Sequence, residues 1–402
     1  MGAKTDVLHH SFARLAILGS LLLGLAGSLG AQHRHADHLV AERIADGMSD
    51  GYQIVVVDLN ADGRLDLLPV ASGLGEIAWY ENTGWQRHVI AHELTRPENV
   101  AAYDIDGDGI PEIGLVSGFA QSPTRSTGTV TILRHDGDPR GLWQATEIDR
   151  VPTSHRVRWA DIDGTGNRVL VNAPLLGAGA EPPDLRADNP LVLYRPGIWQ
   201  RELIATTPGL VHGLYLTDWT GSGRDTIVTA GFAGVFADEL RDGRWQRRPV
   251  LDGDPAPWPN GGASEFTELF AADERWLATV EPWHGHQVVL YRWRDGAWAR
   301  AVIDAPIGLG HDLLGVDLDA SGSETLVVAD RGEETRGVYL YSRTGPGDRD
   351  WLKETLDSDM QASSCAAADL DADGAIDLVC IGRATEELTW YRNAAGGTGP
   401  GT

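Results

Sequence analysis

Residues 58–66 read Asp-Leu-Asn-Ala-Asp-Gly-Arg-Leu-Asp, and the pattern returns at 104–112 (DIDGDGIPE) and at 369–377 (DLDADGAID). The first, third and fifth side chains place three oxygens on one side of a tight loop, and the glycine at the sixth place lets the chain reverse. The seventh residue adds a carbonyl oxygen and the ninth a carboxylate. Because Ca²⁺ prefers about six to eight such oxygens, the pattern predicts three structural calcium sites, although a single DxDG stretch also makes ordinary turns.

The predicted calcium ligands recur at the same places in each loop. They are Asp58, Asn60, Asp62, the Arg64 carbonyl and Asp66; Asp104, Asp106, Asp108, the Ile110 carbonyl and Glu112; and Asp369, Asp371, Asp373, the Ala375 carbonyl and Asp377. Short β-rich runs flank every loop, and no helical periodicity of useful length competes with them.

Weaker copies of the loop keep the same spacing. They begin at Asp161, Asp218 and Asp317, and Asp273 stands where a further copy falls in a short turn. The seven starts are separated by 44 to 57 residues, which is the range of propeller blades. A tryptophan opens the fourth strand of six repeats: Trp85, Trp143, Trp199, Trp245, Trp298 and Trp351. These six are interpreted as packing residues between blades.

The seventh repeat stops at LTWYRN and has no fourth strand, whereas HLVAERIAD at 38–46 is a strand without a repeat. An N-terminal strand that completes the last blade closes the ring. The sequence therefore predicts an all-β, seven-bladed β-propeller over residues 32–394, with calcium loops between the first and second strands. Residues 395–402 are expected to be a flexible tail.

The first 31 residues are predicted to be a secretory signal peptide. Lys4 and Arg14 precede the apolar run 15–30, which ends in small residues. This run is too short and too glycine-rich for a membrane span. A secreted or periplasmic protein is therefore expected. Its oligomeric state is not indicated by the sequence.

Charge and cysteine content narrow the possible partners. The formal net charge is −25, so nucleic acid is an improbable partner because nothing basic is available to neutralise phosphates. Cys365 and Cys380 flank the last calcium loop at equal distances. They form either a disulfide, which an oxidising compartment allows, or a buried pair of small apolar residues.

Three histidines share one position in the repeats. Six residues before each loop aspartate, at the start of the innermost strand, stand Tyr52, Glu98, His155, His212, Thr267, His311 and Ser363. One residue further stand Gln53, Asn99, Arg156, Gly213, Glu268, Asp312 and Ser364. We call the face where the innermost strands begin the start face. The long irregular loops 120–127, 174–189 and 254–265 lie on this face, which favours it as the functional one.

Equivalent placement should aim His155, His212 and His311 at one axis, and the loop EPWHGHQ adds His284 and His286 on the same face. Converging imidazoles either hold zinc or another divalent metal with an open position, or act without metal as general bases beside Arg156. The residues expected to contact a small sugar or glycan are Tyr52, Glu98, Glu268, Asp312, Trp159 and Trp283. A lone histidine is more often structural.

The repeats resemble the FG-GAP (VCBS) family of calcium-loop propellers, which includes the integrin α-subunit head. The histidine-led strands SHRVRWADIDG (154–164), VHGLYLTDW (211–219) and GHDLLGVDLD (310–319), with NAPLLG at 172–177, also resemble the propeller domain of aldos-2-ulose dehydratase. That likeness implies a sugar lyase acting on 1,5-anhydro-fructose or a similar keto-sugar.

Two functions from different classes remain open. The first is a secreted sugar dehydratase, in which a metal or Arg156 polarises a keto-sugar carbonyl, a histidine removes the adjacent proton, and a β-hydroxyl leaves as water. The second is a non-catalytic adhesion or recognition propeller that binds glycan or protein at the same face. The histidine trio favours the enzyme, because a scaffold has no need to aim three imidazoles at one axis.

The calcium sites generate the first prediction. Removal of Ca²⁺ with a chelator should lower the melting temperature, because the uncompensated carboxylates of blades 1, 2 and 7 then repel one another. These blades are neighbours around the ring closure, so that seam should loosen first. The measurement is a thermal melt with and without chelator, and an unchanged melting temperature would contradict the calcium assignment.

Overall fold

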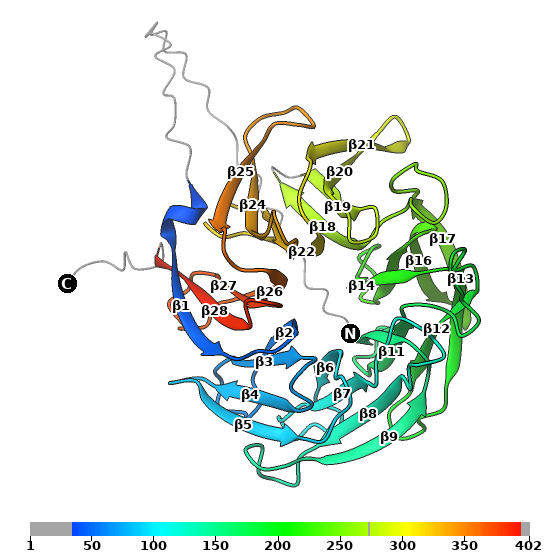
Figure 1. Ribbon diagram of the computed structural model, residues 1–402, viewed down its shortest axis with the longest axis vertical. Coiled ribbons are helices and arrows are strands. Elements are labelled where there is room, and N and C mark those ends of the chain that lie inside the picture. Colours follow the sequence, from blue (N-terminus) through cyan, green and yellow to red (C-terminus); the bar gives the residue numbers. More distant parts are fainter. Residues whose placement is uncertain (1–33, 272–273, 395–402) are drawn as a thin grey trace, which may run out of the picture. The chain divides into compact units, whose positions relative to one another are not determined.

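Seven four-stranded antiparallel sheets follow one another around a central axis (Figure 1). The computed structural model describes residues 34–271 and 274–394. The predicted signal peptide, Asp273 and the predicted tail lie outside the described residues. No helix in the described part of the chain has the length and apolarity that a membrane crossing needs. The predicted fold class, an all-β seven-bladed propeller, is confirmed.

The strands run from the axis outward in chain order. Blades 1 to 3 contain β2 (Gly51–Val57), β3 (Asp66–Ala71), β4 (Ile77–Glu81) and β5 (Gln86–Ala91); β6 (Asn99–Tyr103), β7 (Glu112–Ser117), β8 (Thr129–Arg134) and β9 (Gln144–Arg150); and β10 (Ser154–Ala160), β11 (Val169–Pro174), β12 (Asp188–Tyr194) and β13 (Glu202–Pro208).

Blades 4 to 6 contain β14 (Val211–Thr217), β15 (Thr226–Gly231), β16 (Gly234–Arg241) and β17 (Arg244–Leu251); β18 (Glu265–Ala271), β19 (Glu274–Glu281), β20 (Gln287–Arg294) and β21 (Ala297–Asp304); and β22 (Gly310–Val316), β23 (Thr325–Asp330), β24 (Gly337–Arg343) and β25 (Trp351–Asp357). Blade 7 contains β26 (Ala362–Ala368), β27 (Asp377–Gly382) and β28 (Glu387–Asn393).

The outer strand of blade 7 comes from the other end of the domain. A short 3-10 helix, η1 (His35–His38), precedes β1 (Leu39–Asp46), and β1 pairs antiparallel with β28 from Leu39 opposite Asn393 to Asp46 opposite Glu387. Leu39 is buried in the core between blades 6 and 7, and Arg43 forms an ion pair with Glu387. This is the strand that the repeat pattern assigns to the last blade.

Each blade is buried on both faces against its neighbours. The second strands are therefore continuous apolar runs, such as TLVVAD in β23, in which every residue is buried. The fourth strands face solvent, and QATEIDR in β9 is mostly exposed. The sequence pattern of short apolar runs follows from this double-sided burial.

A tyrosine–aspartate contact repeats between neighbouring blades. In each case a tyrosine on the third strand donates its hydroxyl to an aspartate at the end of the preceding blade's fourth strand, at 2.7 Å. The pairs are Tyr194 with Asp149, Tyr341 with Asp304, and Tyr391 with Asp357. A hydrogen bond to a charged group contributes about 1.5–3 kcal/mol, so these contacts fix the angle between blades beyond what apolar packing does.

The acidic loops keep their shape through their first aspartate. Asp58 accepts the N–H of Gly63 at 2.8 Å, and the same contact occurs in the weaker copies, as between Asp161 and Gly166. The carboxylate oxygens of two sets lie within 4.8 Å of one another: Asp104, Asp106 and Asp108, and Asp369, Asp371 and Asp377. The first aspartate therefore has a role in the turn besides the calcium ligation that remains predicted.

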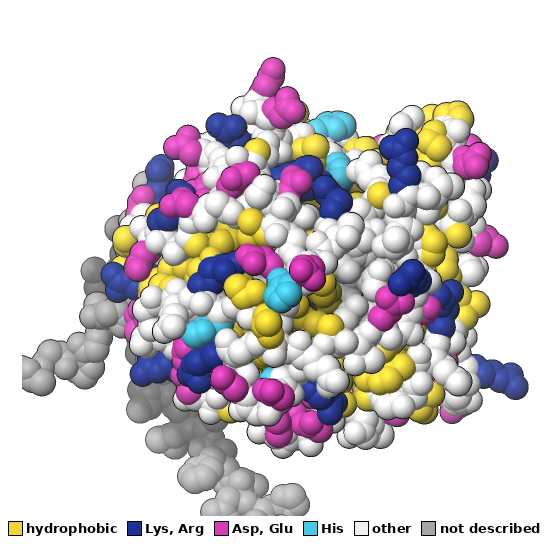
Figure 2. All heavy atoms as spheres, turned by 60° about the horizontal axis from the view of Figure 1, so that its bottom comes forward, with side chains coloured by type: hydrophobic (Ala, Val, Ile, Leu, Met, Phe, Trp, Pro, Cys, Tyr) yellow, Lys and Arg dark blue, Asp and Glu magenta, His cyan; other side chains and the backbone are white. Residues whose placement is uncertain are grey.

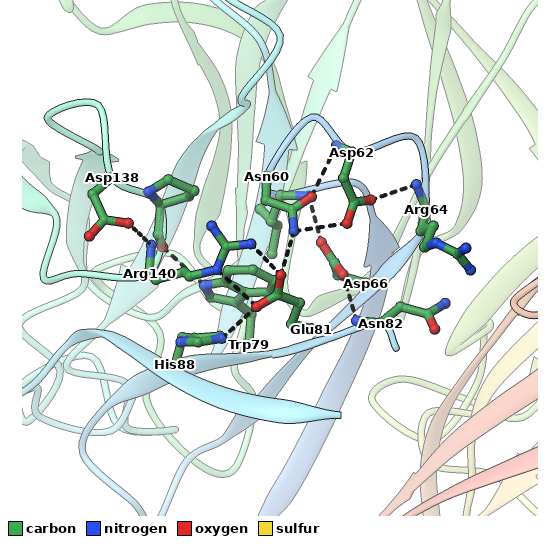
Figure 3. A network of polar contacts seen from close by, with 12 residues as sticks. Asn60, Asp62, Arg64, Asp66, Trp79, Glu81, Asn82, His88, Asp138 and Arg140 are labelled. Carbon is green, nitrogen blue, oxygen red and sulfur yellow. Dashed lines mark hydrogen bonds and ion pairs between the residues drawn. The ribbon is translucent and has the colours of Figure 1, made fainter. Parts of the chain in front are cut away.

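The loop of blade 1 is joined to blade 2 by a polar network (Figure 3). Asn60 donates its side-chain amide to Asp62 and to Glu81, at 3.2 and 2.9 Å. Glu81 also accepts from His88 and forms an ion pair with Arg140 of the next blade. The amide at the third place of this loop is thus held in position by the end of β4.

Cys365 and Cys380 are directly opposite each other on β26 and β27 and form a disulfide. Of the two interpretations left open by the sequence, the disulfide is the one found. On the face drawn in Figure 2, acidic and basic side chains are interspersed and no broad basic area forms.

The position of β1 generates a second prediction. Deletion of residues 38–46 should leave β28 as an unpaired edge, lower the melting temperature and promote aggregation. Size-exclusion chromatography and a thermal melt measure both effects. Deletion of residues 34–37 alone is the matched control and should be close to wild type. A monomeric, equally stable 38–46 deletion would show that the ring does not need this strand.

Candidate functional site

The innermost strand of five blades carries one extra residue near its start. The register against the second strand shifts there in blades 1, 3, 4, 6 and 7. The residues at the shift are Tyr52, His155, His212, His311 and Ser363. A bulge of this kind re-aims a side chain, and the shared sequence offset of the histidines corresponds to it.

Blade 5 is aligned differently from the prediction. Ser264 donates its backbone N–H to Val280 at 2.8 Å, as Glu98 does to Val116 in blade 2. Ser264 and Glu265 therefore occupy the places assigned to Thr267 and Glu268. The prediction placed the start of this strand six residues before Asp273, as in the other blades. The turn between β18 and β19 is shorter than the acidic loops, so that distance does not apply in blade 5.

Four imidazoles and one phenol meet at the axis on the start face. The ring centroid of His212 lies 4.8 Å from those of His155 and His284, and 5.1 Å from that of His311. Tyr52 packs edge-on against His311 at 5.0 Å. The prediction that His155, His212 and His311 share one site agrees with this geometry, and His284 joins them from the turn between β19 and β20.

A cavity of about 560 Å³ opens over this cluster. Aromatic rings on its walls are Tyr52, Phe119, His155, His212, Trp283 and His284. Charged groups on its walls are Asp50, Glu98, Arg96, Arg125, Arg331 and Arg383. The volume is in the range of small-molecule sites, and the mixture of rings and ionic groups suits a polyhydroxylated ligand.

Hydrogen bonds to Nδ1 fix the ring orientation of two histidines. The Nδ1–H of His212 donates to Glu265 Oε1 at 2.7 Å, and the Nδ1–H of His311 donates to the Ser363 carbonyl at 2.6 Å. Both Nε2 atoms therefore carry lone pairs. Histidines that ligate metals are held in this way, by a carboxylate or a carbonyl on the other nitrogen.

One nitrogen each of His212, His284 and His311 lies within 4.8 Å of the other two. His311 Nε2 is buried without a hydrogen-bond partner, and His212 Nε2 lies 3.1 Å from His284 Nε2. Zinc bound by three imidazoles at about 2.0–2.1 Å brings the nitrogens to this kind of spacing. The donor set thus fits a tetrahedral metal with one open position.

His155 stands apart from this trio. Its Nε2 lies 2.5 Å from the Tyr52 hydroxyl, and its Nδ1 is buried without a partner. Burial, together with the Arg156 guanidinium, holds the pKa of His155 well below its usual range. The ring is therefore neutral, and its Nε2 accepts a hydrogen bond from the Tyr52 hydroxyl. Burial also raises the pKa of Tyr52. His284 rather than His155 thus lies with His212 and His311 in the set whose nitrogens could share a metal, and the joint role of His155, His212 and His311 stays a prediction.

Arg156 lies below the cavity floor. Its guanidinium donates to Glu265 at 3.0 Å and lies 5.0 Å from the centre of the Tyr52 ring. Glu265 thus links Arg156 to His212. Gly213 makes room for this carboxylate, because a Cβ there would lie 3.1 Å from Glu265 Oε2. Arg156 is therefore a positioning residue, and the sequence prediction that it polarises a substrate carbonyl is not supported by its place.

Burial raises the pKa of Glu98 to about 7, against the opposing effect of Arg156. Its carboxyl lines the cavity and accepts the Ser72 hydroxyl at 3.2 Å. Burial also raises the pKa of Asp312 to about 6, but this carboxylate accepts the backbone N–H of Cys365 below the floor. Glu98 is thus the cavity carboxyl whose proton exchanges near neutral pH.

Three predicted site residues lie elsewhere. His286 is exposed and does not line the cavity. Trp159 donates its indole N–H to the Ala101 carbonyl and packs between blades 2 and 3. Glu268 forms an ion pair with Arg275 and accepts Thr217 Oγ1 at 2.7 Å. Their spacing placed them near the start face, but packing and ion pairing turn them from it.

Arg331 was missed by the sequence reasoning. It follows β23 and donates from Nη2 to His284 Nε2 at 3.1 Å. Burial lowers the pKa of Arg331 to about 10, and it remains a cation. It precedes the third strand rather than the first, so alignment on the innermost strands could not reveal it. A comparison of the loops between second and third strands, which also lie on the start face, could have pointed to it.

A second hollow of about 570 Å³ adjoins the cavity and shares Gln121, Ser122, Leu175 and Trp283 with it. Its remaining walls are mainly apolar and come from the long loop of blade 3, including Leu176, Pro182 and Leu185. The insertion that the sequence showed therefore builds a wall beside the site.

Comparison with known proteins agrees with the geometry. Residues 127–294 match the family model described as the β-propeller domain of aldos-2-ulose dehydratase, and residues 58–115 match the FG-GAP-like repeat. The first match spans His155, His212, Glu265 and His284. Both predicted resemblances are confirmed, and the propeller is carbohydrate-related at this coarse level. No curated protein matches.

Solved structures share the fold at low identity. A protein titled as a 6-phosphogluconolactonase from Bacteroides uniformis is 13% identical with a TM-score of 0.50, covering 87% of this chain and 94% of that one. A gluconolactonase from Xanthomonas campestris is 15% identical (TM-score 0.44; 88% and 89% covered). An Agrocybe aegerita lectin that recognises terminal N-acetylglucosamine is 15% identical (TM-score 0.47; 76% and 80%).

The space beside Glu265 generates a third prediction. Gly213→Ala should destabilise the protein by about 1–3 kcal/mol, because the new Cβ also meets Ser264 O at 2.9 Å and forces the strands or the carboxylate to shift. Denaturant unfolding measures the change. Gly141→Ala is the control, since its nearest neighbour lies 3.8 Å away and it should cost little. Equal stability of the two variants would show that Glu265 is not confined by Gly213.

Proposed function

We propose that the protein is a carbohydrate-active lyase that eliminates water from a keto-sugar resembling 1,5-anhydro-fructose, with the cavity over the histidine cluster as its active site. The observation that carries the proposal is a cluster of four imidazoles, of which His155, His212 and His284 line a sugar-sized cavity and His311 is buried behind them. Much of that cluster lies within the stretch matching the dehydratase propeller. Elimination next to a carbonyl needs an electrophile for the oxygen, a base for the adjacent proton and an acid for the leaving hydroxyl.

The electrophile in this proposal is a divalent metal, for which zinc fits the donor set best. One ring nitrogen each of His212, His284 and His311 would hold it. Because His284 Nε2 accepts from Arg331 Nη2 at 3.1 Å, that hydrogen bond would have to be released for this nitrogen to bind a metal. When bound, such an ion supplies Lewis-acid polarisation of a carbonyl oxygen. Glu265 and the Ser363 carbonyl keep two of the three rings in the required tautomer.

Glu98 is the proposed base. As a carboxylate it removes the proton from the carbon beside the carbonyl, and its pKa of about 7 matches that task at neutral pH. The buried histidines are less suitable, because burial holds the pKa of His155 and of His212 well below its usual range. The sequence-based assignment of a histidine as base is therefore replaced.

Tyr52 and His155 form the proposed proton donor for the leaving group. The Tyr52 hydroxyl lines the cavity and its proton is shared with His155 Nε2 at 2.5 Å. Donation of this proton lets the β-hydroxyl depart as water, and the proton taken by Glu98 returns to the pair through solvent. The products are the unsaturated keto-sugar and one water.

We also propose that the protein acts outside the cytoplasm. Support comes from the leader pattern of residues 1–31 and from the Cys365–Cys380 disulfide, which persists in an oxidising compartment. Calcium in the loops of blades 1, 2 and 7 belongs to the same proposal, since its extracellular supply saturates such sites.

The fourth prediction separates metal binding from proton transfer. Ala variants of His212, His284 and His311 should lose both bound zinc and turnover of 1,5-anhydro-fructose. His155→Ala is the matched variant, and it should keep the metal while losing activity roughly 10²- to 10⁴-fold. Metal analysis of purified protein and ultraviolet absorbance of the unsaturated product are the two readouts.

The pH profile tests Glu98. A base is active as the carboxylate, so turnover should rise with pH through about 7. The Glu98→Gln variant should lose most of the activity, and its residual activity should no longer rise with pH in this range. Wild-type protein that binds keto-sugars without converting them would instead support the recognition propeller. Metal retained by all three of the His212, His284 and His311 variants would refute the metal assignment.

A further inference from the structure

Arg331 is a buried cation that no acid balances directly. Arg331 is 7% exposed, and among the described residues no ion pair joins its guanidinium directly to a carboxylate, although Glu98 lines the same cavity and acts on it electrostatically. Its Nε atom is buried without a hydrogen-bond partner. The described contacts of the group are a hydrogen bond from Nη2 to His284 Nε2 and a position 5.8 Å from the centre of the Tyr52 ring. The guanidinium nevertheless lines the cavity.

Arg156 shows how this protein treats a buried cation that serves structure. Glu265 accepts its hydrogen bond at 3.0 Å, and both groups are removed from solvent together. A buried charge without such a partner is costly, and a native structure keeps one where a ligand supplies the missing charge. Arg331 therefore lacks the direct carboxylate partner that Arg156 has in Glu265.

Further arginines stand at the rim of the same cavity. Arg96 and Arg383 both approach Asp50, at 3.7 and 3.2 Å, so that two cations share one carboxylate. Arg125 is exposed on the loop of blade 2, and no carboxylate of the described residues pairs with it. Four arginines against Asp50 and Glu98 give this cavity a positive excess in a chain whose formal net charge is −25. Local charge of the opposite sign to the whole protein attracts anions selectively.

We infer that the sugar bound in this cavity carries an anionic group, such as a carboxylate or a phosphate, which Arg331 binds with help from the rim arginines. A guanidinium presents paired N–H donors that match carboxylate and phosphate oxygens. The inference rests on the proposed function in taking the ligand to be a sugar, and it narrows the substrate class to acidic sugars. Because Arg331 lies 3.1 Å from His284 Nε2, the anion would bind beside His284.

Binding of three sugars with the same ring tests the inference without any turnover. D-Glucose, D-glucuronate and D-glucose 6-phosphate differ at one carbon, and isothermal titration calorimetry measures their affinity for the full-length protein. At least one acidic sugar should bind roughly 10- to 100-fold more tightly than glucose, as charge-assisted hydrogen bonds provide. Which of the two is preferred distinguishes a carboxylate ligand from a phosphate ligand.

Variants assign the effect to Arg331. Arg331→Met should weaken binding of the acidic sugar at least 10-fold more than binding of glucose, and Arg331→Lys should restore part of the preference. Arg244→Met is the control, because Arg244 is exposed on β17 and the change in net charge is the same. Far-ultraviolet circular dichroism of each variant verifies that the propeller is folded.

Three results would overturn the inference: equal affinity for glucose and both acids, no binding of either acid, or equal loss of glucose and acid binding in Arg331→Met. Failure of the proposed function is separate. A preference for an acidic sugar together with absent elimination of any keto-sugar would leave Arg331 as an anion site in a recognition protein. Elimination of water from neutral 1,5-anhydro-fructose, without any preference for acidic sugars, would support the lyase function and contradict the inference of an anionic substrate.

Discussion

The extra residue at the start of the innermost strands is the constraint on which the site depends. A regular strand points alternate side chains into the two neighbouring blades, and only a bulge turns one toward the axis without disturbing the rest of the sheet. Because the register shift recurs in blades 3, 4 and 6, it brings His155, His212 and His311 to one floor. The site is thus a product of rotational repetition, and no loop has to fold specially to assemble these three rings.

Polar residues near the start of the innermost strand in three blades help to make that floor rigid. Gln53 exchanges two hydrogen bonds with the backbone of Val100 in the next blade, and Asn99 accepts the N–H of Val157 in the one after. Asp312 makes the corresponding contact with Cys365. Side chains therefore continue the hydrogen bonding from blade to blade where the backbone cannot. Such cross-links hold the imidazoles in fixed positions, which a preorganised site requires.

Much of this arrangement could be predicted from the sequence because repeats carry positional information. One aspartate per blade gave the strand order, the two faces and the shared offset of the histidines. The same alignment failed in blade 5, where the acidic loop is reduced to a turn. There it assigned Glu268 to the place that Glu265 occupies. It also could not separate His155 from His284, because the choice depends on which nitrogen meets Tyr52, Glu265 or Arg331. Tautomers and partners are properties of the packed state, and the period of a sequence does not contain them.

Three of the buried polar atoms without partners lie where the histidines meet. His155 Nδ1, His311 Nε2 and Arg331 Nε are all removed from water around one floor, while the neighbouring Arg156, Glu265 and Asp312 have partners. Each unsatisfied group lowers the free energy of unfolding by about 1–3 kcal/mol. Apolar packing on both faces of each blade and the tyrosine–aspartate contacts offset this loss. A fold that needed only to be stable would satisfy these atoms or replace them with apolar groups. Because His155 Nε2 accepts from Tyr52, its Nδ1 carries the ring proton, and His311 Nε2 is the one of these two nitrogens with a free lone pair. The proposed metal would satisfy His311 Nε2, and the inferred anionic sugar would satisfy the Arg331 guanidinium.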